Sequence, residues 1–312
     1  MSPRVLIYSL IMVVLWGSHF TVATLTMRDG DAGRLSVHGL IFFKMLMACG
    51  CLGLVMLFTG RLRALRRYTW WQLAGLVLAG FFGYYLYYVL LFNAARRAAP
   101  LGASAEASIL NYLFPMCTLL ASAAIIGEKL TRRALISAVI SFAGAYLVIC
   151  KGDLTQAVPE HWRIDLLALF AAVSWGVFSA LARRWPHEPL SGMFIFLFTG
   201  LVISGVVLPF APGRHIPTGW EIYGAFHVGF ICNTVATLLW LAALRHAGAS
   251  LVGNIALLTA VVNLLFICLL IPGQSVHWSA AVGLAVILFG VLLARAGRCK
   301  VRVVPDADEP PA

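Results

Sequence analysis

The segment NYLFPMCTLLASAAIIGEKLTRR, residues 111–133, is a long apolar run with two features that are unusual in a buried helix. An amide side chain, Asn111, stands at its start, and a proline, Pro115, follows one turn later. Proline removes a backbone hydrogen bond and bends a helix, and polar groups are costly inside a membrane. We therefore predict a membrane-spanning helix that is kinked at Pro115 and carries a polar point at Asn111.

Similar uncharged runs recur along the whole chain of 312 residues. Hydrophobic residues make up 61% of the sequence and charged residues 11%, whereas soluble domains carry about 25% charged residues. A run of about 20 apolar residues crosses the hydrocarbon core, and a helix satisfies its own backbone there. We predict an all-α membrane protein with ten spans, at residues 5–27, 37–59, 70–95, 101–126, 134–150, 164–182, 190–211, 220–244, 247–271 and 276–294.

The net charge of +11 is explained by membrane topology. Lysine and arginine are much more frequent in the loops that share a side with the N-terminus than in the opposite loops. Because this excess is typical of cytoplasmic loops, we expect both termini in the cytoplasm and no nucleic-acid partner. Residues 297–312, basic and then rich in Asp, Glu and Pro, are expected to be a disordered cytoplasmic tail.

Catalytic and metal-binding patterns are absent from the sequence. The seven cysteines form no CxxC pair, so neither a disulfide framework nor a zinc site is indicated. No HExxH, GxSxG or Walker-type phosphate-binding motif occurs. We therefore expect neither an enzyme nor an ATP-driven pump, and no cofactor.

The two halves of the chain resemble each other. Matched pairs, separated by 146 to 159 positions, are Trp16 and Trp175, Gly17 and Gly176, Trp71 and Trp220, Gly75 and Gly224, Gly80 and Gly229, Gly127 and Gly273, and Gly144 and Gly290. Because five helices form each copy, successive copies enter the membrane from opposite sides, and the repeats are inverted. We expect repeats at residues 1–152 and 153–296 and a binding site where they meet, an arrangement typical of transport by alternating access.

Three motifs resemble those of a known transporter family. Trp16-Gly17, FFKML around Lys44, and NYLFP with a later Gly-Glu are similar to the EamA-domain branch of the drug/metabolite transporter superfamily. More narrowly, Glu106 followed by ASILNYLFP resembles the YddG-type exporters of aromatic amino acids. The second half departs from the family pattern, with Thr259-Ala260-Val261 in place of the proline and Gln274 at the helix end. We therefore do not expect the two halves to bend alike.

Ionisable side chains inside spans are the first candidates for ligand binding. Lys44 and Glu106 lie about five to seven residues into their spans, His227 reaches a similar depth, and His19 lies somewhat deeper. A cation, an anion and two imidazoles at one depth would hold a zwitterion, gate the site as an ion pair or carry protons. The alternatives are that Lys44 extends its ammonium to the interface and that Glu106 is stabilised by its helix N-terminus.

Aromatic residues complete the predicted site. The stretch FFGYYLYYVLLFNAA repeats aromatic side chains at helical spacing, and a tyrosine in mid-bilayer needs a partner for its hydroxyl. Trp16 and Trp175 are repeat-related, and we expect them to form the floor and lid of an apolar slot. The predicted substrate-binding set is Trp16, His19, Lys44, Tyr85, Tyr88, Asn93, Glu106, Asn111, Trp175, His227 and Trp240.

Together these features predict a multi-pass transporter of the bacterial inner membrane. The resemblance implies export of small amphipathic metabolites, above all aromatic or other neutral amino acids. Export of cationic drugs, nucleotide sugars or other anionic metabolites is the alternative within the superfamily, and a membrane scaffold or membrane-embedded enzyme is the alternative outside it. The expected partners are an amino-acid substrate and the lipid bilayer, and the expected assembly is a monomer or weak homodimer.

Overall fold

The computed structural model describes residues 3–27, 35–153, 160–185, 187–211, 216–246, 255–256 and 258–296. Every regular element among them is helical. The α-helices are α1 (Pro3–Met27), α2 (Val37–Phe58), α3 (Trp70–Gly80), α4 (Tyr87–Ala98), α5 (Ser104–Asn111), α6 (Phe114–Ile126), α7 (Arg132–Ile149), α8 (Trp162–Arg184), α9 (Pro189–Val207), α10 (Trp220–Phe226), α11 (Ala236–His246), α13 (Leu258–Leu270) and α14 (Trp278–Ala296).

Eight helical segments among the described residues are long and apolar enough to cross a membrane. They are Leu6–Met27, Val37–Phe58, Trp70–Leu101, Ser104–Ile126, Arg132–Ile149, Trp162–Arg184, Pro189–Phe210 and Trp220–Trp240. Two further apolar helices, Leu258–Leu270 and Trp278–Leu293, are shorter. The chain is therefore a multi-pass helical membrane protein, whereas the predicted tail at residues 297–312 lies outside the described residues.

Side-chain caps and left-handed residues explain where several helices begin and end. Ser36 and Thr131 accept hydrogen bonds from the backbone of the first turns of α2 and α7, and Thr69 forms a capping box with Gln72 at the start of α3. Gly127 ends α6 with a φ of 79°. Glycine adopts this left-handed conformation without steric cost, so the chain reverses there.

The predicted kink at Pro115 is a break between two helices. α5 ends at Asn111, and α6 begins at Phe114 with Pro115 in its first turn. In a first turn the missing N–H of proline costs nothing, because that donor has no partner within the helix. Proline therefore starts a new helix here, and Asn111 is the last residue of the helix before the break.

Two segments of π-helix interrupt long helical runs of the chain. Phe81–Leu86 joins α3 to α4, and His227–Val235 joins α10 to α11. Side chains from neighbouring helices bond to carbonyl groups within both segments: Ser174 Oγ donates to Phe82 O at 2.7 Å, and Trp16 Nε1 donates to Cys232 O at 3.0 Å. Such π-segments are frequent at functional sites.

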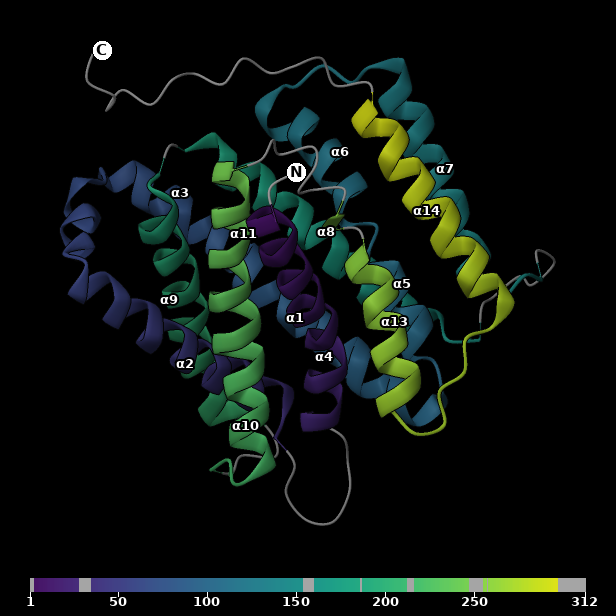
Figure 1. Cartoon of the computed structure of the whole chain (residues 1–312), viewed down its shortest axis with the longest axis horizontal. Helices are drawn as coiled ribbons and strands as arrows, with labels where there is room; N and C mark the ends of the chain where they lie inside the picture. Colours follow the sequence, from purple (N-terminus) through teal and green to yellow (C-terminus); the bar gives the residue numbers. More distant parts are fainter. Residues whose placement is uncertain are drawn as a thin grey trace.

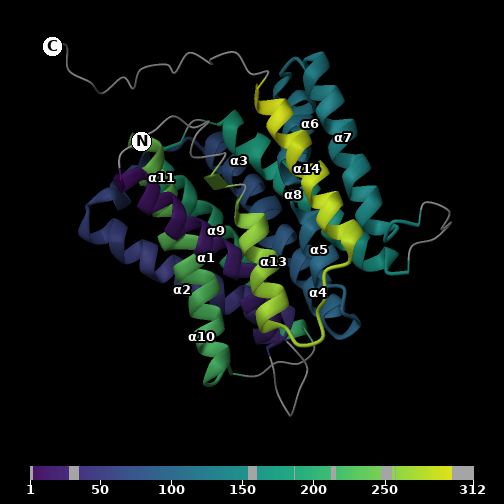
Figure 2. The ribbon, with the colours of Figure 1, turned by 45° about the vertical axis from the view of Figure 1, so that its right-hand side comes forward.

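Glycines allow close crossings between helices that are far apart in the sequence. A Cβ on Gly17 would lie 2.6 Å from Val262 in α13, and a Cβ on Gly176 would lie 2.6 Å from the backbone of Cys117 in α6. Gly144 in α7 crosses α14 equally closely, so these two helices lie side by side along their length (Figures 1 and 2). Figure 1 also shows that α1 begins and α14 ends at the same end of the bundle.

Candidate functional site

Lys44 lies at the centre of the most unusual polar arrangement in the fold. It is fully buried on α2, and its Nζ is 2.9 Å from the centroid of the Tyr88 ring and 5.3 Å from that of Phe92. The ammonium has no hydrogen-bond partner and forms no salt bridge among the described residues. A buried lysine normally requires a partner, because removing a charge from water is costly.

His19 and Asn233 complete this group with Lys44, Tyr88 and Phe92, and we call these five residues the Lys44 cluster. The His19 ring lies 5.6 Å from the Tyr88 ring and stacks on Phe92 at 5.8 Å. The Tyr88 hydroxyl donates to Asn233 Oδ1 at 3.0 Å. His19 Nε2 and Asn233 Nδ2 are buried without a hydrogen-bond partner. Unpaired cationic and amide groups of this kind are suited to an anionic ligand.

His227 joins the edge of the Lys44 cluster through α1. Its Nε2 is 2.8 Å from Ser18 Oγ, and Ser18 lies next to His19 in the chain. The Cys232 thiol donates to Leu15 O at 3.1 Å on the same helix. α1, α2, the segment from α3 to α4, and the segment from α10 to α11 thus meet at one point.

Trp16 and Trp175 pack against different aromatic neighbours. The Trp16 ring pairs with Trp240 at 5.7 Å, whereas Trp175 packs against Tyr87 at 4.8 Å and Phe178 at 5.0 Å. Tyr87 also contacts Tyr88 at 4.8 Å. The aromatic rings around Trp175 therefore adjoin the Lys44 cluster through Tyr87.

Asn111 belongs to the Trp175 side of this arrangement. Its Nδ2 donates to the Tyr87 hydroxyl at 3.1 Å, while its Oδ1 is buried without a partner. The break between α5 and α6 places this amide beside the aromatic rings. The polar point predicted from the sequence thus adjoins Tyr87, which had not been singled out.

Three predicted residues lie apart from the Lys44 cluster. Tyr85 packs against Phe81 and His38, and Asn93 Nδ2 donates to Val89 O of its own helix at 2.7 Å. No hydrogen bond or salt bridge among the described residues joins Glu106 to Lys44. The ion pair between Glu106 and Lys44 that the sequence allowed is therefore not formed between these described residues.

Glu106 has a neighbour that the sequence reasoning missed. Asp165 is 6% exposed in the first turn of α8, and α8 packs against α5, which carries Glu106. Asp165 stands just inside its predicted span, where a residue near a helix end is easily assigned to the interface. Ser18 and Cys232 were also missed, because small polar side chains give no distinctive pattern in an apolar helix.

Two ion pairs connect segments that are far apart in the sequence at one end of the bundle. Arg61 Nη1 is 2.9 Å from Glu188 Oε1, and Arg183 pairs with Glu128 after α6. Partial burial alone would raise the pKa of Glu188, but hydrogen bonds from Ser191, together with Arg61, outweigh burial and lower it. At the other end, Gln274 accepts from Ser104 N and donates to Ala99 O, both at 3.0 Å.

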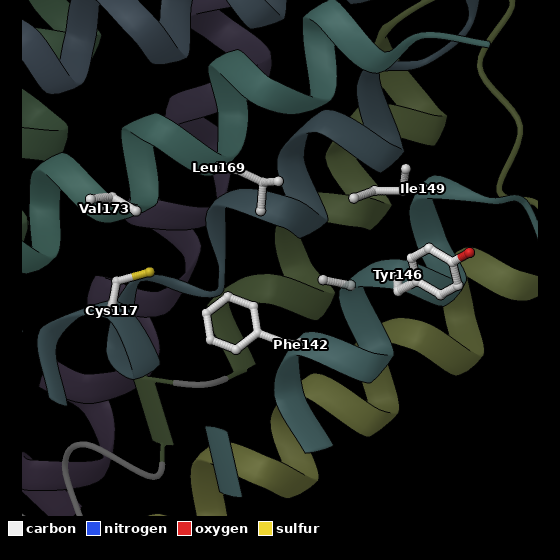
Figure 3. Close-up of a pocket in the computed structure, with 7 residues that line it drawn as sticks. Cys117, Phe142, Tyr146, Ile149, Leu169 and Val173 are labelled. Carbon is white, nitrogen blue, oxygen red and sulfur yellow. The ribbon is translucent and has the colours of Figure 1, made fainter. Parts of the chain in front are cut away.

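An apolar pocket of about 240 Å³ lies between α6, α7 and α8 (Figure 3). Its lining residues are Cys117, Phe142, Ala145, Tyr146, Ile149, Leu169 and Val173. It shares no residue with the Lys44 cluster. No group of three or more potential metal ligands occurs among the described residues.

The fold is that of a multi-pass helical membrane protein. The sequence profile of the EamA-like transporter family matches residues 3–150 and 162–296. The chain belongs to this family, which is part of the drug/metabolite transporter superfamily.

Two curated relatives are similar over most of the chain. The aromatic amino acid exporter YddG of Ancylobacter novellus is 26% identical over 70% of this chain and 73% of its own length. The uncharacterized transporter YyaM of Bacillus subtilis is 23% identical over 91% of this chain and 93% of its own length. A solved crystal structure shares the fold with a TM-score of 0.58 and 22% identity, covering 94% of this chain and 97% of its own.

Proposed function

We propose that this protein is a secondary transporter that exports aromatic or other neutral amino acids across the bacterial inner membrane by alternating access. The observation that carries the proposal is the buried ammonium of Lys44, which lies among aromatic rings and has no anionic partner. A substrate carboxylate would supply that partner through a charge-assisted hydrogen bond. The unpaired Asn233 Nδ2 offers a further donor close by.

The aromatic residues around Lys44 fit the rest of such a substrate. Tyr88, Phe92 and Tyr87 offer ring faces and edges, against which an aromatic side chain packs favourably. Trp175 and Asn111 both contact Tyr87, which in turn packs against Tyr88 of the cluster. The similarity to a relative named as an aromatic amino acid exporter supports the same substrate class.

Matched crossings support an architecture of ten helices in two inverted repeats. Gly17 meets α13 at Asn263, and the matched Gly176 meets α6 at Cys117. The two π-helical segments also occupy matched positions. In this architecture the repeats occupy residues 1–152 and 153–296, both termini are cytoplasmic, and the transporter is a monomer or weak homodimer.

A second cargo class is favoured by the same lysine. A buried cation without a neighbouring carboxylate suits any substrate that carries an anionic group, including carboxylate or phosphate metabolites. It does not suit cationic drugs, because two like charges would meet in a medium of low dielectric constant. Anionic metabolites are therefore the alternative that the test must include.

Counterflow in proteoliposomes tests the proposal without any assumption about the driving force. Vesicles are loaded with unlabelled phenylalanine, and transient uptake of labelled phenylalanine is followed with amino acids, nucleotide sugars and cationic dyes as competitors. Uptake that is competed by aromatic amino acids and lost in Lys44→Met, but retained in Lys129→Met, is the expected result. Exchange of another class of compound in the same vesicles, without phenylalanine uptake, would overturn the substrate assignment.

A further inference from the structure

Arginine is concentrated in one short helix between α2 and α3. Four of the seven residues of the 3₁₀-helix Arg61–Arg67 are arginine, and we call this helix the arginine segment. The sequence contains no acidic residue between Asp31 and Glu106. Arg61 pairs with Glu188, and no other acid among the described residues forms a salt bridge with the segment. The arginine segment therefore carries positive charge that the described part of the chain leaves largely uncompensated.

The other three arginines of the segment are available to an external anion. Arg63, Arg66 and Arg67 are exposed and form no hydrogen bond or salt bridge with any described residue. Side chains three residues apart share a face of a 3₁₀-helix, and one turn rises about 6 Å. Arg63 and Arg66 thus lie one above the other, while Leu62 and Leu65 pack against the hydrophobic core. The segment presents two neighbouring guanidinium groups away from the core.

Contacts with the start of α9 fix both ends of the arginine segment. Arg61 Nη1 lies 2.9 Å from Glu188 Oε1. Just after the segment, the Tyr68 hydroxyl lies 2.6 Å from Ser191 Oγ and accepts a hydrogen bond from Glu188 N at 3.1 Å. Because these contacts order the segment before any anion arrives, binding there costs less conformational entropy than binding to a loose chain.

The arginine segment lies at the surface of the bilayer. It begins three residues after the membrane-spanning segment Val37–Phe58 and ends three residues before the membrane-spanning segment Trp70–Leu101. Phe58, Trp70 and Trp71, at the ends of these spans, are 84%, 73% and 78% exposed. Aromatic side chains in this position lie at the level of the lipid head groups. The arginines are therefore flanked on both sides by rings against which lipid packs.

We propose that the arginine segment is a binding site for an anionic phospholipid of the adjoining leaflet. The lipid phosphate accepts charge-assisted hydrogen bonds from Arg63 and Arg66, because the planar guanidinium group matches the geometry of a phosphate. The acyl chains lie along Phe58 and Trp70. An acidic soluble protein or a nucleic acid is less suited, since the site lies between two spans and has exposed apolar side chains on both flanks. The binding site does not depend on which cargo is transported.

A second basic loop provides a matched control. Lys129, Arg132 and Arg133 are also exposed. They follow the fourth span, as the arginine segment follows the second, so both groups lie on the same side of the membrane. Lys129 stands in a stretch without regular structure, and the two arginines open α7. This loop has the same number of unpaired basic residues but does not present them on one ordered turn.

Thermal unfolding of the full-length chain in uncharged detergent tests the proposal. Phosphatidylglycerol, which is anionic, is compared with phosphatidylcholine, which has a phosphate but no net charge. Uncharged micelles lack the general attraction of an anionic membrane surface. We expect phosphatidylglycerol to raise the unfolding temperature of the wild type more than phosphatidylcholine does. The difference should disappear when Arg63→Gln, Arg66→Gln and Arg67→Gln are combined, and should remain when Lys129→Gln, Arg132→Gln and Arg133→Gln are combined.

Three outcomes would overturn the proposal. The first is a lipid-dependent difference that persists in the arginine-segment variant, and the second is one that is lost equally in the control variant. The third is equal protection by inorganic polyphosphate, which would indicate a soluble polyanion as the partner.

Native mass spectrometry measures the binding itself and does not depend on any change in stability. Wild type and variants are titrated with phosphatidylglycerol, and the protein with bound lipid is counted. The arginine-segment variant should bind at least about fivefold more weakly than the wild type, whereas the control variant should bind nearly as the wild type does. Wild-type affinity in the arginine-segment variant would contradict the assignment of the site.

Discussion

The ammonium nitrogen of Lys44 lies 2.9 Å from the centroid of the Tyr88 ring, closer than it lies to any other aromatic ring among the described residues. Cation–π attraction partly compensates the charge, by about 2 kcal/mol or more when the pair is desolvated. Several kcal/mol are needed to offset the burial of an ion. The remainder is what a bound anion would supply, so Lys44 is the residue on which the transport proposal depends most.

Replacement of Lys44 by methionine should abolish transport while preserving the fold. Methionine fills a similar volume and removes the charge, and loss of a charged hydrogen bond costs about 1.5–3 kcal/mol. We expect counterflow to fall by at least tenfold, with unchanged expression and thermal stability equal to or above that of the wild type. The matched control is Lys129→Met, which removes a lysine after α6. A wild-type rate in Lys44→Met would contradict the assignment.

Substitution at Tyr88 should separate the role of its ring from that of its hydroxyl. Tyr88→Phe keeps the ring over Lys44 and removes only the hydrogen bond to Asn233, worth about 1 kcal/mol. We expect an apparent affinity for substrate weakened by about fivefold. Tyr88→Leu also removes the ring and should weaken the apparent affinity for substrate considerably more. Equal effects of the two changes on counterflow would mean that the ring contact does not matter.

A side chain at Gly229 should disrupt the crossing of two helices. A Cβ there would collide with the backbone of Lys44, and a backbone, unlike a flexible side chain, has little room to yield. Gly229→Ala should therefore destabilise the protein by about 1–3 kcal/mol, the usual cost of overpacking, measured by thermal unfolding in detergent. Gly50→Ala, on the adjoining α2 and with open space around it, is the control and should change stability little.

The hydrogen bonds from Ser191 to Glu188, together with the ion pair between Glu188 and Arg61, should make stability depend on pH. Because the pKa of Glu188 is lowered in the folded protein, its stabilising contribution is complete above the ordinary glutamate pKa. That contribution is lost as pH falls through the lower, folded value. The difference in thermal stability between the wild type and Glu188→Gln should therefore be at most about 1 kcal/mol at neutral pH, because the pair is partly exposed.

The role of Glu188 is tested by whether the difference in thermal stability between the wild type and Glu188→Gln shrinks or grows as pH falls. Thermal unfolding in detergent, followed from neutral into acidic solution, should show the two proteins converging as the carboxyl group becomes protonated. Arg61→Gln should show a smaller difference in the same direction, because it removes the ion pair but leaves the hydrogen bond from Ser191 N in place. A difference that grows as pH falls would contradict the assignment.

The class of fold could be predicted from hydropathy alone. Every helix that crosses lipid needs a long apolar run and satisfies its backbone hydrogen bonds internally. The break at residues 112–113 could not be predicted. A proline in an apolar run is compatible with either a kink or a new helix, and the choice depends on the helices that surround it. The π-helical segments were also missed, because one extra residue per turn leaves no trace in an apolar pattern.

The grouping of side chains in the Lys44 cluster could be predicted in part. Lys44, His19 and Tyr88 do lie together, and an ionisable residue inside an apolar run was sufficient to find the lysine. The aromatic neighbours of Trp16 and Trp175 could not be predicted, because they depend on how the helices pack: Trp16 pairs with Trp240, and Trp175 packs against Tyr87. Asp165 was missed because depth counted along one helix does not show which neighbouring helix carries a like charge.

The uncharged hydrogen bonds of Gln274 have a consequence for how the protein responds to salt. Exposed ion pairs occur at both ends of the bundle, with Arg183 and Glu128 at one end and Lys151 and Glu160 at the other, where Gln274 also lies. Dissolved ions screen exposed charges over about 8 Å at physiological ionic strength, but they leave neutral hydrogen bonds nearly unaffected. Raising the salt concentration should therefore weaken the ion pairs at both ends, while the amide of Gln274 keeps α5 joined to the loop before α14.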